Sequence, residues 1–264
     1  MTKLFNLDKQ KSSLIREDLG GYQQYKSVEV DTHPQPFPNK GREKQAFTLA
    51  EVLITLAIIG VVAAMTIPTL IQDFKKREAS VKIKRFYSAM TQAIQLSEID
   101  NGPALSWGIK DYKDEDGNLL DDSIRLENAL IFYNKYIRPY LKLAKEQTNE
   151  EIARRYDIFL IDGSMFSISN GSCTDFIYDT NGLKPPNANG QDKFYFLLCD
   201  EKNNKLHHLH TPNRAFGTYG HHTATPSFER SEALKSCEKT PIMCSTLLEL
   251  FDNWEFKDDY PHKL

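Results

Sequence analysis

Apolar residues are concentrated most strongly between positions 47 and 71. The segment FTLAEVLITLAIIGVVAAMTIPTLI contains a single charged residue, Glu51, and the next charge is Asp73. As an α-helix that rises about 1.5 Å per residue, residues 47–67 would extend roughly 30 Å, the thickness of the hydrocarbon core of a bilayer. We therefore expect residues 47–70 to form a helix that can cross a membrane.

Glu51 is the unusual residue of this segment. A carboxylate placed centrally in a membrane helix is unfavourable by about 2.5–3.5 kcal/mol even on lenient insertion scales, so such a group usually has a partner. Residues 47–71 contain no Lys, Arg or His. A counter-charge for Glu51 would have to come from another chain, from lipid headgroups, or from a new amino terminus made by cleavage nearby.

The pattern becomes amphipathic after residue 70. Apolar or small residues recur every three or four positions on one helical face, and Asp100-Asn-Gly-Pro103 then breaks the helix. We expect residues 71–100 to continue the first helix, with Pro68 bending or loosening it because proline removes a backbone donor. The residues of the apolar face are Ile83, Phe86, Tyr87, Met90, Ala93, Ile94 and Ser97.

Residues 101–264 are expected to form a head of α+β class. A second helix is predicted from Ile124 to Glu146, interrupted at Arg138-Pro139. Two strands, 156–161 and 165–169, are predicted on either side of an Asp162-Gly163 turn, because Asp-Gly accepts positive φ. Residues 193–199 are predicted as a third strand and 205–209 as a fourth. A helix followed by antiparallel strands is the element order of an α+β protein. The aromatic residues expected to pack in the core of the head are Tyr195, Trp254, Phe256 and Tyr260.

The start of the apolar segment resembles the type IV prepilin and type II secretion pseudopilin family. Members of that family have a basic leader, a small residue, a cleavage point, and then Phe-Thr-Leu-x-Glu at the start of a hydrophobic helix. The family usually has Gly where this chain has Ala46. The matching residues here are Lys40, Arg42, Lys44, Ala46, Phe47, Thr48, Leu49, Ala50 and Glu51, followed by Gly60 and Pro68 at the positions of the family's helix Gly and Pro.

The resemblance implies a processing and assembly pathway. A prepilin peptidase would remove residues 1–46 between Ala46 and Phe47, and the new Phe47 amine would be N-methylated. Glu51 would meet the amino terminus of a neighbouring subunit, without a catalytic role. The resemblance also implies a long helix packed on a small antiparallel sheet, with other pilin or pseudopilin subunits and inner-membrane lipid as partners.

The expected location follows from the same segment. The basic residues before the apolar run favour a cytoplasmic leader, so the chain would cross the inner membrane once and place its head in the periplasm or in an extracellular fibre. The sequence leaves three alternatives open: a secretory signal peptide, a simple membrane anchor, and a tethered module that binds a ligand, a surface or DNA without entering a fibre. N-terminal processing distinguishes the last from a pilin.

The net charge argues weakly against a nucleic-acid-binding protein. The formal charge of the whole chain is −3, and removal of the leader, which is slightly basic, makes the remainder more negative. Nucleic-acid binders normally carry a basic surface, so we expect no nucleic acid as a partner. There is no Gly-rich phosphate loop and no Gly-x-Ser-x-Gly motif in the sequence, so we expect a protein that is not an enzyme.

All four cysteines lie in the predicted head. An even number outside the cytoplasm favours disulfides, with three possible connectivities. We favour Cys173 with Cys199 and Cys237 with Cys244; free thiols are the alternative, and zinc is disfavoured because there is no Cys-x-x-Cys pair.

Two clusters could hold metal ions. The loop 179–192 gathers oxygen donors that suit Ca²⁺, although its spacing is not that of an EF-hand, and Asn and Asp are also ordinary turn residues. Some pseudopilins hold calcium in a loop of their sheet region, so the resemblance adds some support for this ion; apart from it we expect no cofactor. The calcium candidates are Asp179, Asn181, Asn187, Asn189 and Asp192, and a histidine cluster that could bind a transition metal comprises His207, His208, His210, His221 and His222.

Overall fold

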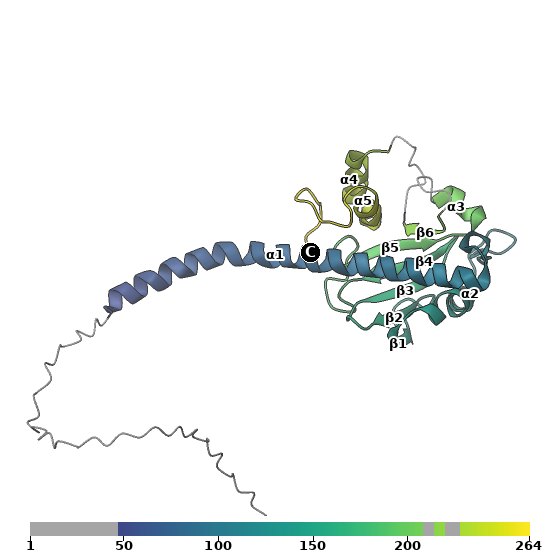
Figure 1. Cartoon of the computed structure of the whole chain (residues 1–264), viewed down its shortest axis with the longest axis horizontal. Coiled ribbons are helices and arrows are strands. Elements are labelled where there is room, and N and C mark those ends of the chain that lie inside the picture. The colour runs from purple at the N-terminus through teal and green to yellow at the C-terminus, as the bar shows by residue number, and fades with distance from the viewer. Residues whose placement is uncertain (1–46, 208–213, 220–227) are drawn as a thin grey trace, which may run out of the picture. The chain divides into compact units, whose positions relative to one another are not determined.

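The computed structural model describes residues 47–207, 214–219 and 228–264, without the side chains of 205–207. The predicted leader, residues 1–46, lies outside this range. The described chain from Ala50 onward forms one unit, with a long N-terminal helix and an antiparallel sheet (Figure 1). The predicted α+β, pilin-like fold class is confirmed.

The first helix, α1, runs from Leu49 to Asn101 without interruption. It ends inside the predicted breaker, where Gly102 has a φ of +77°, a left-handed conformation that glycine adopts without steric cost. Its two halves differ in environment, because no residue before Ala79 is buried whereas eight are buried from that point onward. Pro68 and Gly60 both belong to the unburied half.

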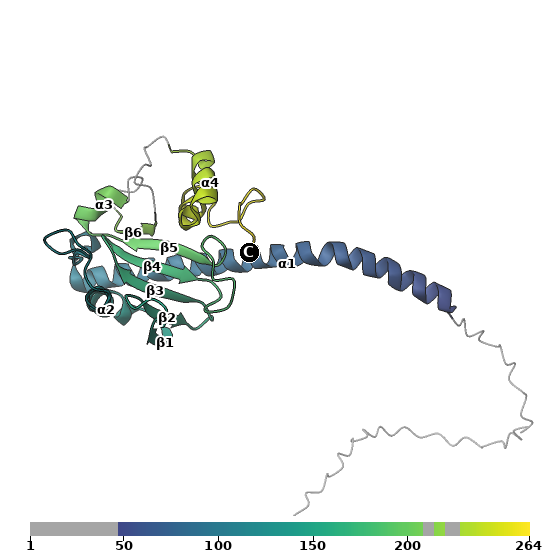
Figure 2. The same cartoon turned by 180° about the vertical axis from the view of Figure 1, so that it is seen from behind.

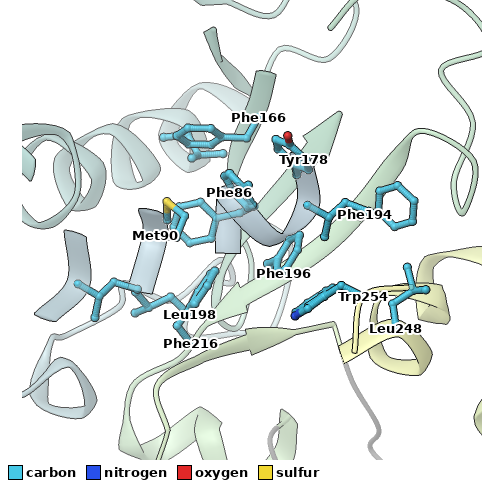
Figure 3. Packing of buried hydrophobic residues seen from close by; sticks show 14 of the residues in the cluster. Phe86, Met90, Phe166, Tyr178, Phe194, Phe196, Leu198, Phe216, Leu248 and Trp254 are labelled. Carbon is cyan, nitrogen blue, oxygen red and sulfur yellow. The ribbon is translucent and has the colours of Figure 1, made fainter. Parts of the chain in front are cut away.

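The buried face of α1 is the one that the hydrophobic periodicity predicted. Phe86 lies at its centre, with ring centroids 4.2 Å from Tyr178, 5.1 Å from Phe196 and 5.4 Å from Phe166 (Figure 3). Tyr87 is only partly buried and packs beside Trp254, at 5.0 Å. The buried residues of α1 are Ala79, Ser80, Ile83, Phe86, Met90, Ala93, Ile94 and Ser97.

The sheet has six strands in sequential order, and every neighbouring pair is antiparallel (Figure 1). α1 crosses one face of it, and the view from behind shows the sheet in front of the helix (Figure 2). The register places Met165 opposite Asp179 and Asn170 opposite Thr174. The strands are β1 (Leu143–Thr148), β2 (Tyr156–Leu160), β3 (Met165–Asn170), β4 (Thr174–Asp179), β5 (Lys193–Leu198) and β6 (Phe216–Thr218).

The predicted β2–β3 hairpin is confirmed. Leu160 donates its backbone N–H to the carbonyl of Ser164 at 2.9 Å, and Gly163 has a φ of +80°. The predicted third strand is β5. The sequence analysis did not identify β1, β4 or β6, although β4 is central and pairs with both β3 and β5.

The predicted helix from Ile124 to Glu146 is wrong in its second part. The helix α2 covers Asp122–Tyr136, a 3-10 turn follows at Arg138–Tyr140, and Glu146 lies in β1. Pro139 cannot continue the helix because it has no backbone N–H. Beyond it the chain pairs with β2, and the Glu146 carboxylate accepts a hydrogen bond from the Tyr133 hydroxyl at 2.8 Å.

The predicted fourth strand, 205–209, is also wrong where the structure describes it. Glu201–His207 form the short helix α3, whose first turn is held by the Asp200 carboxylate, which accepts the backbone N–H of Asn203 at 3.0 Å. Residues 208 and 209 lie outside the described residues. The remaining elements are η1 (Ala104–Ser106), α4 (Arg230–Lys239), η3 (Pro241–Met243) and α5 (Cys244–Leu250).

The C-terminal segment closes the core. Trp254, Phe256 and Tyr260 are all buried, as predicted, whereas Tyr195 is only partly buried. Trp254 stacks on Phe196 with ring centroids 5.8 Å apart (Figure 3). The segment is fixed by Arg230, whose guanidinium binds the carboxylates of Asp252 and Asp259 at 2.6–3.0 Å.

Candidate functional site

The processing motif lies at the point where helical structure begins. Phe47 and Thr48 precede α1, and the Phe47 side chain is 83% exposed. Ala46, the predicted residue before the cleavage point, lies outside the described residues. A peptidase needs an extended, accessible peptide. On the C-terminal side of the Ala46–Phe47 bond this requirement is met, because Phe47 and Thr48 are exposed and non-helical.

Glu51 occupies the first turn of α1. A carboxylate is favoured there because the unsatisfied N–H groups of a helix start carry a partial positive charge. Leu49, Val52 and Leu53 around it are exposed by 43–79%. The carboxylate therefore sits at the end of an uncovered apolar surface, where a partner subunit could approach it.

The N-terminal half of α1 is apolar and uncovered. It is strongly apolar over at least 18 residues, and none of these is buried. Exposed apolar patches on soluble monomers rarely exceed a few hundred Å², so a continuous apolar helix of this length needs lipid or other protein around it. One helix of the described chain is thus long and apolar enough for single-pass membrane anchoring.

Gly60 and Pro68 lie on this uncovered half. A Cβ added to Gly60 would meet nothing within 4 Å, so the glycine leaves space for a close approach from outside the chain. Pro68 lies inside continuous helix, and Thr66, two residues before it, donates its hydroxyl to the Val62 carbonyl at 3.0 Å. The kink at Pro68 stays a prediction, since α1 passes through it unbroken.

The structure brings three of the five predicted calcium ligands together. Asp192, 4% exposed, accepts the backbone N–H groups of Asn187 and Ala188 at 2.8 and 2.7 Å, and the side-chain amide of Asn181 at 3.1 Å. Asp179 accepts the backbone N–H of Asn181 at 3.1 Å. Asp192 therefore organises the loop through hydrogen bonds.

The other two predicted ligands are used differently. Asn189 accepts a hydrogen bond from the Tyr195 hydroxyl at 3.1 Å, and Asn187 directs its amide to the Leu183 carbonyl at 3.2 Å. Two buried oxygens of the loop have no hydrogen-bond partner, Asp179 Oδ2 and Asn181 Oδ1. Ca²⁺ takes six to eight oxygen ligands, so the loop as arranged supplies only part of a calcium site.

Asp179 has an unusual electrostatic environment. Its side chain is buried at the end of β4, and this burial, together with the nearby Asp192 carboxylate, raises the pKa of Asp179 to about 7. The backbone N–H groups of Asn181 and Gly182 act in the opposite direction. The raised pKa means that the folded protein binds this proton more tightly than the unfolded chain does.

Both favoured disulfides are present. Cys173 is bonded to Cys199 and Cys237 to Cys244, and no described cysteine is free. The first bond connects the start of β4 to the end of β5, and the second joins α4 to α5. Of the predicted histidine cluster, only His207 falls in described backbone, at the end of α3; the other four histidines lie outside the described residues.

A partly buried network that attaches α5 to the sheet was not predicted from the sequence. The Glu249 carboxylate accepts the backbone N–H and the hydroxyl of Thr218 at 3.0 and 2.6 Å and pairs with Arg214. Burial and this carboxylate raise the pKa of Tyr87 to about 12. An isolated Glu in a short apolar helix was the available signal, but its partners are 31 and 35 residues away.

Comparisons with known families divide the chain at Pro68. Residues 41–67 match the model of the prokaryotic N-terminal methylation motif, which is the motif of type IV prepilin-like proteins. Residues 69–264 match the model described as Family of unknown function (DUF6613). No curated protein and no solved structure matches the chain. The chain therefore belongs to the DUF6613 family and carries a type IV prepilin-like N-terminus.

Proposed function

We propose that this protein is a pilin-like structural subunit. A prepilin peptidase cleaves it between Ala46 and Phe47 and methylates the new amine, and the product assembles into a type IV pilus or a type II secretion pseudopilus. The observation that carries the proposal is the uncovered apolar half of α1, which begins with the methylation motif and is joined without a break to a packed head.

The apolar half needs two successive environments under this proposal. Before assembly, lipid covers it and the chain is a single-pass membrane protein. After assembly, the equivalent helices of neighbouring subunits replace the lipid. The exposed Gly60 supports close packing of this kind, because small residues let helix backbones approach one another in apolar surroundings.

Glu51 supplies the proposed specificity of assembly. Cleavage before Phe47 creates an amine four residues from Glu51, and each subunit then carries one positive and one negative group at the same end of α1. Pairing between neighbours neutralises charges that are costly in an apolar environment. The protein then has a structural role without catalysis, and its partners are the peptidase and other pilin-type subunits.

Mass spectrometry of the membrane fraction tests the processing step. We expect an N-terminal peptide that begins with methylated Phe47, and we expect the intact leader in a strain that lacks the prepilin peptidase. Ala46→Arg should block cleavage, whereas Ala46→Gly, which restores the residue usual in the family, should preserve it. A mature protein that retains residues 1–46 contradicts the proposal and favours a tethered binding module.

Glu51 variants test assembly separately. We expect Glu51→Gln to be cleaved normally but depleted from sheared fibres, and Glu51→Asp to be depleted less, because it keeps the charge. Glu127→Gln, in α2 of the head, is the matched control. Equal incorporation of Glu51→Gln and wild type would remove the proposed role of this residue.

Calcium binding at the 179–192 loop is a separate prediction. The two unpartnered oxygens, Asp179 Oδ2 and Asn181 Oδ1, are the groups that a cation would engage first. Isothermal titration with CaCl₂ should give heat in the wild type and none in Asp179→Asn if the loop rearranges to bind the ion. Identical titrations would leave the loop as a turn held by Asp192.

A further inference from the structure

Two turns lie at the end of the head from which the apolar half of α1 emerges. Residues 161–164 connect β2 to β3, and residues 180–192 connect β4 to β5. Met165, the first residue of β3, pairs with Asp179, the last residue of β4, so both turns lie at the same end of the strands. A Cβ at Gly182 would lie 3.0 Å from the Gly163 carbonyl, so the turns touch. We call this end of the head, with residues 75–85 of α1, the basal surface (Figure 1).

The 180–192 turn is attached directly to α1. The Lys82 ammonium donates to the Thr180 carbonyl at 2.9 Å and pairs with Glu78 at 2.9 Å. A hollow of about 230 Å³ lies between this turn and α1, lined by residues that include Lys75, Lys82 and Lys184. A second hollow, of about 440 Å³, includes Lys76, Arg77 and Phe256 in its lining.

The basal surface is strongly basic. Of the 11 residues from 75 to 85, six are Lys or Arg and one is acidic. Within the described residues, no ion pair involves Lys75, Arg77 or Lys184. All three residues are exposed to solvent. The acidic residues nearby are Asp73, Glu78, Asp162, Asp179, Asp192 and Glu255. Asp179 and Asp192 are buried beneath the second turn, and Glu78 and Glu255 are paired with Lys82, Lys84 and Lys257.

Exposed apolar side chains accompany these cations. Ile161 is 73% exposed in the first turn, and Leu183, beside Lys184, is 61% exposed in the second. On α1, Phe74 is 66% exposed immediately before Lys75. Apolar side chains flanked by Lys and Arg are the composition of segments that lie at the surface of an anionic membrane.

The position along the helix agrees with this composition. From Leu49 to Lys75, α1 rises about 39 Å. A bilayer with its headgroup layers is about 40–45 Å thick. When the start of α1 lies at one surface of the membrane, Lys75 and Arg77 therefore lie in the headgroup layer of the opposite leaflet, and the head begins at Ala79.

We propose that the basal surface docks on anionic phospholipids of the leaflet on the side of the head. Lys75, Arg77 and Lys184 bind phosphate oxygens, while Ile161 and Leu183 enter the boundary between headgroups and acyl chains. The proposal rests only on the membrane-anchored stage of the proposed function. It also explains why many cations follow the membrane span, an arrangement that the positive-inside tendency disfavours on an exported side.

Hydrogen exchange of the full-length chain in lipid nanodiscs tests the docking. Discs of phosphatidylcholine alone are compared with discs containing 30% phosphatidylglycerol. Each Lys or Arg near an anionic surface strengthens binding about fivefold, so three together strengthen it by the order of 100-fold. We expect the amides of residues 161–164 and 181–184 to exchange more slowly in the anionic discs, by about threefold or more, and this protection to disappear in high salt.

Matched variants assign the effect. Lys75→Gln/Arg77→Gln/Lys184→Gln should abolish the difference between the discs, and Ile161→Ser/Leu183→Ser should reduce it. The control variant Lys110→Gln/Lys113→Gln/Lys142→Gln removes the same number of positive charges. It should show the same difference in exchange between the two kinds of disc as the wild type. This control lies toward the other end of the head, where the Lys110 carbonyl accepts from Asn170 and Tyr140 binds Asp100 near the end of α1.

Two results would overturn the proposal. One is equal exchange of both turns in the two kinds of disc. The other is protection that appears in phosphatidylcholine and grows with the number of chains per disc, which would indicate contact between copies of the chain. The measurement uses unprocessed protein, so failure of cleavage or of fibre assembly does not affect its outcome.

Discussion

The two halves of α1 have the same secondary structure and opposite environments. From Leu49 to Glu78 no residue is buried, whereas from Ala79 to Ser97 one face is covered by the sheet and by the C-terminal segment. Apart from Glu51, residues 49–71 carry no charge on any side, whereas the second half is amphipathic. The difference shows that α1 is a part of the head for half of its length and a separate interaction element for the other half.

The largest expected effect is from truncation at the centre of the packed half. Phe86→Ala should lower the free energy of unfolding of the head by about 4 kcal/mol, because a fully packed Phe is replaced by a cavity. Leu53→Ala, at a 57% exposed position of the other half, should leave it unchanged. Thermal unfolding in detergent, followed by near-UV circular dichroism, measures both. Equal losses would show that the two halves are coupled.

The disulfides should stabilise only the head, and to different extents. The bond Cys173–Cys199 closes a span of 26 residues and Cys237–Cys244 a span of 7. On the chain-entropy model, the paired Cys→Ser replacements should cost about 3.5 and about 2.4 kcal/mol respectively. The same unfolding assay checks the order. A larger loss at Cys237–Cys244 would mean that packing around it outweighs loop entropy.

Asp179 should make the stability of the head depend on pH. Its folded-state pKa, about 7, exceeds the usual value near 3.9. The folded state therefore binds the proton more tightly, so the contribution of this group to stability is complete below about pH 4 and is lost as the pH rises to 7. At pH 8, Asp179→Asn should be more stable than wild type by up to about 4 kcal/mol, because one pKa unit corresponds to about 1.4 kcal/mol. Its slope should be smaller than that of the wild type, and the remainder should come from Asp175, whose pKa burial also raises to about 7. Denaturation at several pH values tests this.

Denaturation at several pH values in the presence of CaCl₂ also tests calcium binding. An ion at the loop would bind the ionised Asp179 carboxylate, so excess CaCl₂ should reduce the slope between pH 4 and 7 in the wild type to that of Asp179→Asn. A slope that is unchanged by CaCl₂ and by chelator would count against calcium at this loop while leaving the prediction for Asp179 intact.

The smallest effect is expected at Pro68. Pro68→Ala restores a backbone donor at an exposed position of the unburied half. The free energy of unfolding of the head should change by about 0.5 kcal/mol or less. A comparison substitution in the packed half, Ala93→Pro, should lower it by about 3 kcal/mol or more, because proline removes a helical hydrogen bond and clashes with the preceding turn. A large effect of Pro68→Ala would refute the independence of the two halves.

Local sequence was sufficient for elements whose cause is local. The apolar run, the buried face of residues 83–97, the break at Asp100–Pro103 and the Asp162-Gly163 turn were all predicted from composition and periodicity, because helix pattern and turn chemistry are written in adjacent residues. The processing motif was recognisable for the same reason. The pairing of Cys173 with Cys199 was preferred correctly, although β4, which begins beside Cys173, was not predicted.

Tertiary contacts decided the rest. Residues 143–146 are a strand because β2 pairs with them, and β4 was missed because its burial comes from both neighbouring strands and not from its own pattern. Asp192 became the organiser of its loop through amides that the fold brings to it. The basal surface unites residues 161, 183 and 75, which are far apart in the chain. The sequence determined that this protein has an apolar helix that begins within an N-terminal methylation motif. The register of the sheet, a property of long-range pairing, determined which side chains surround that helix where it leaves the head.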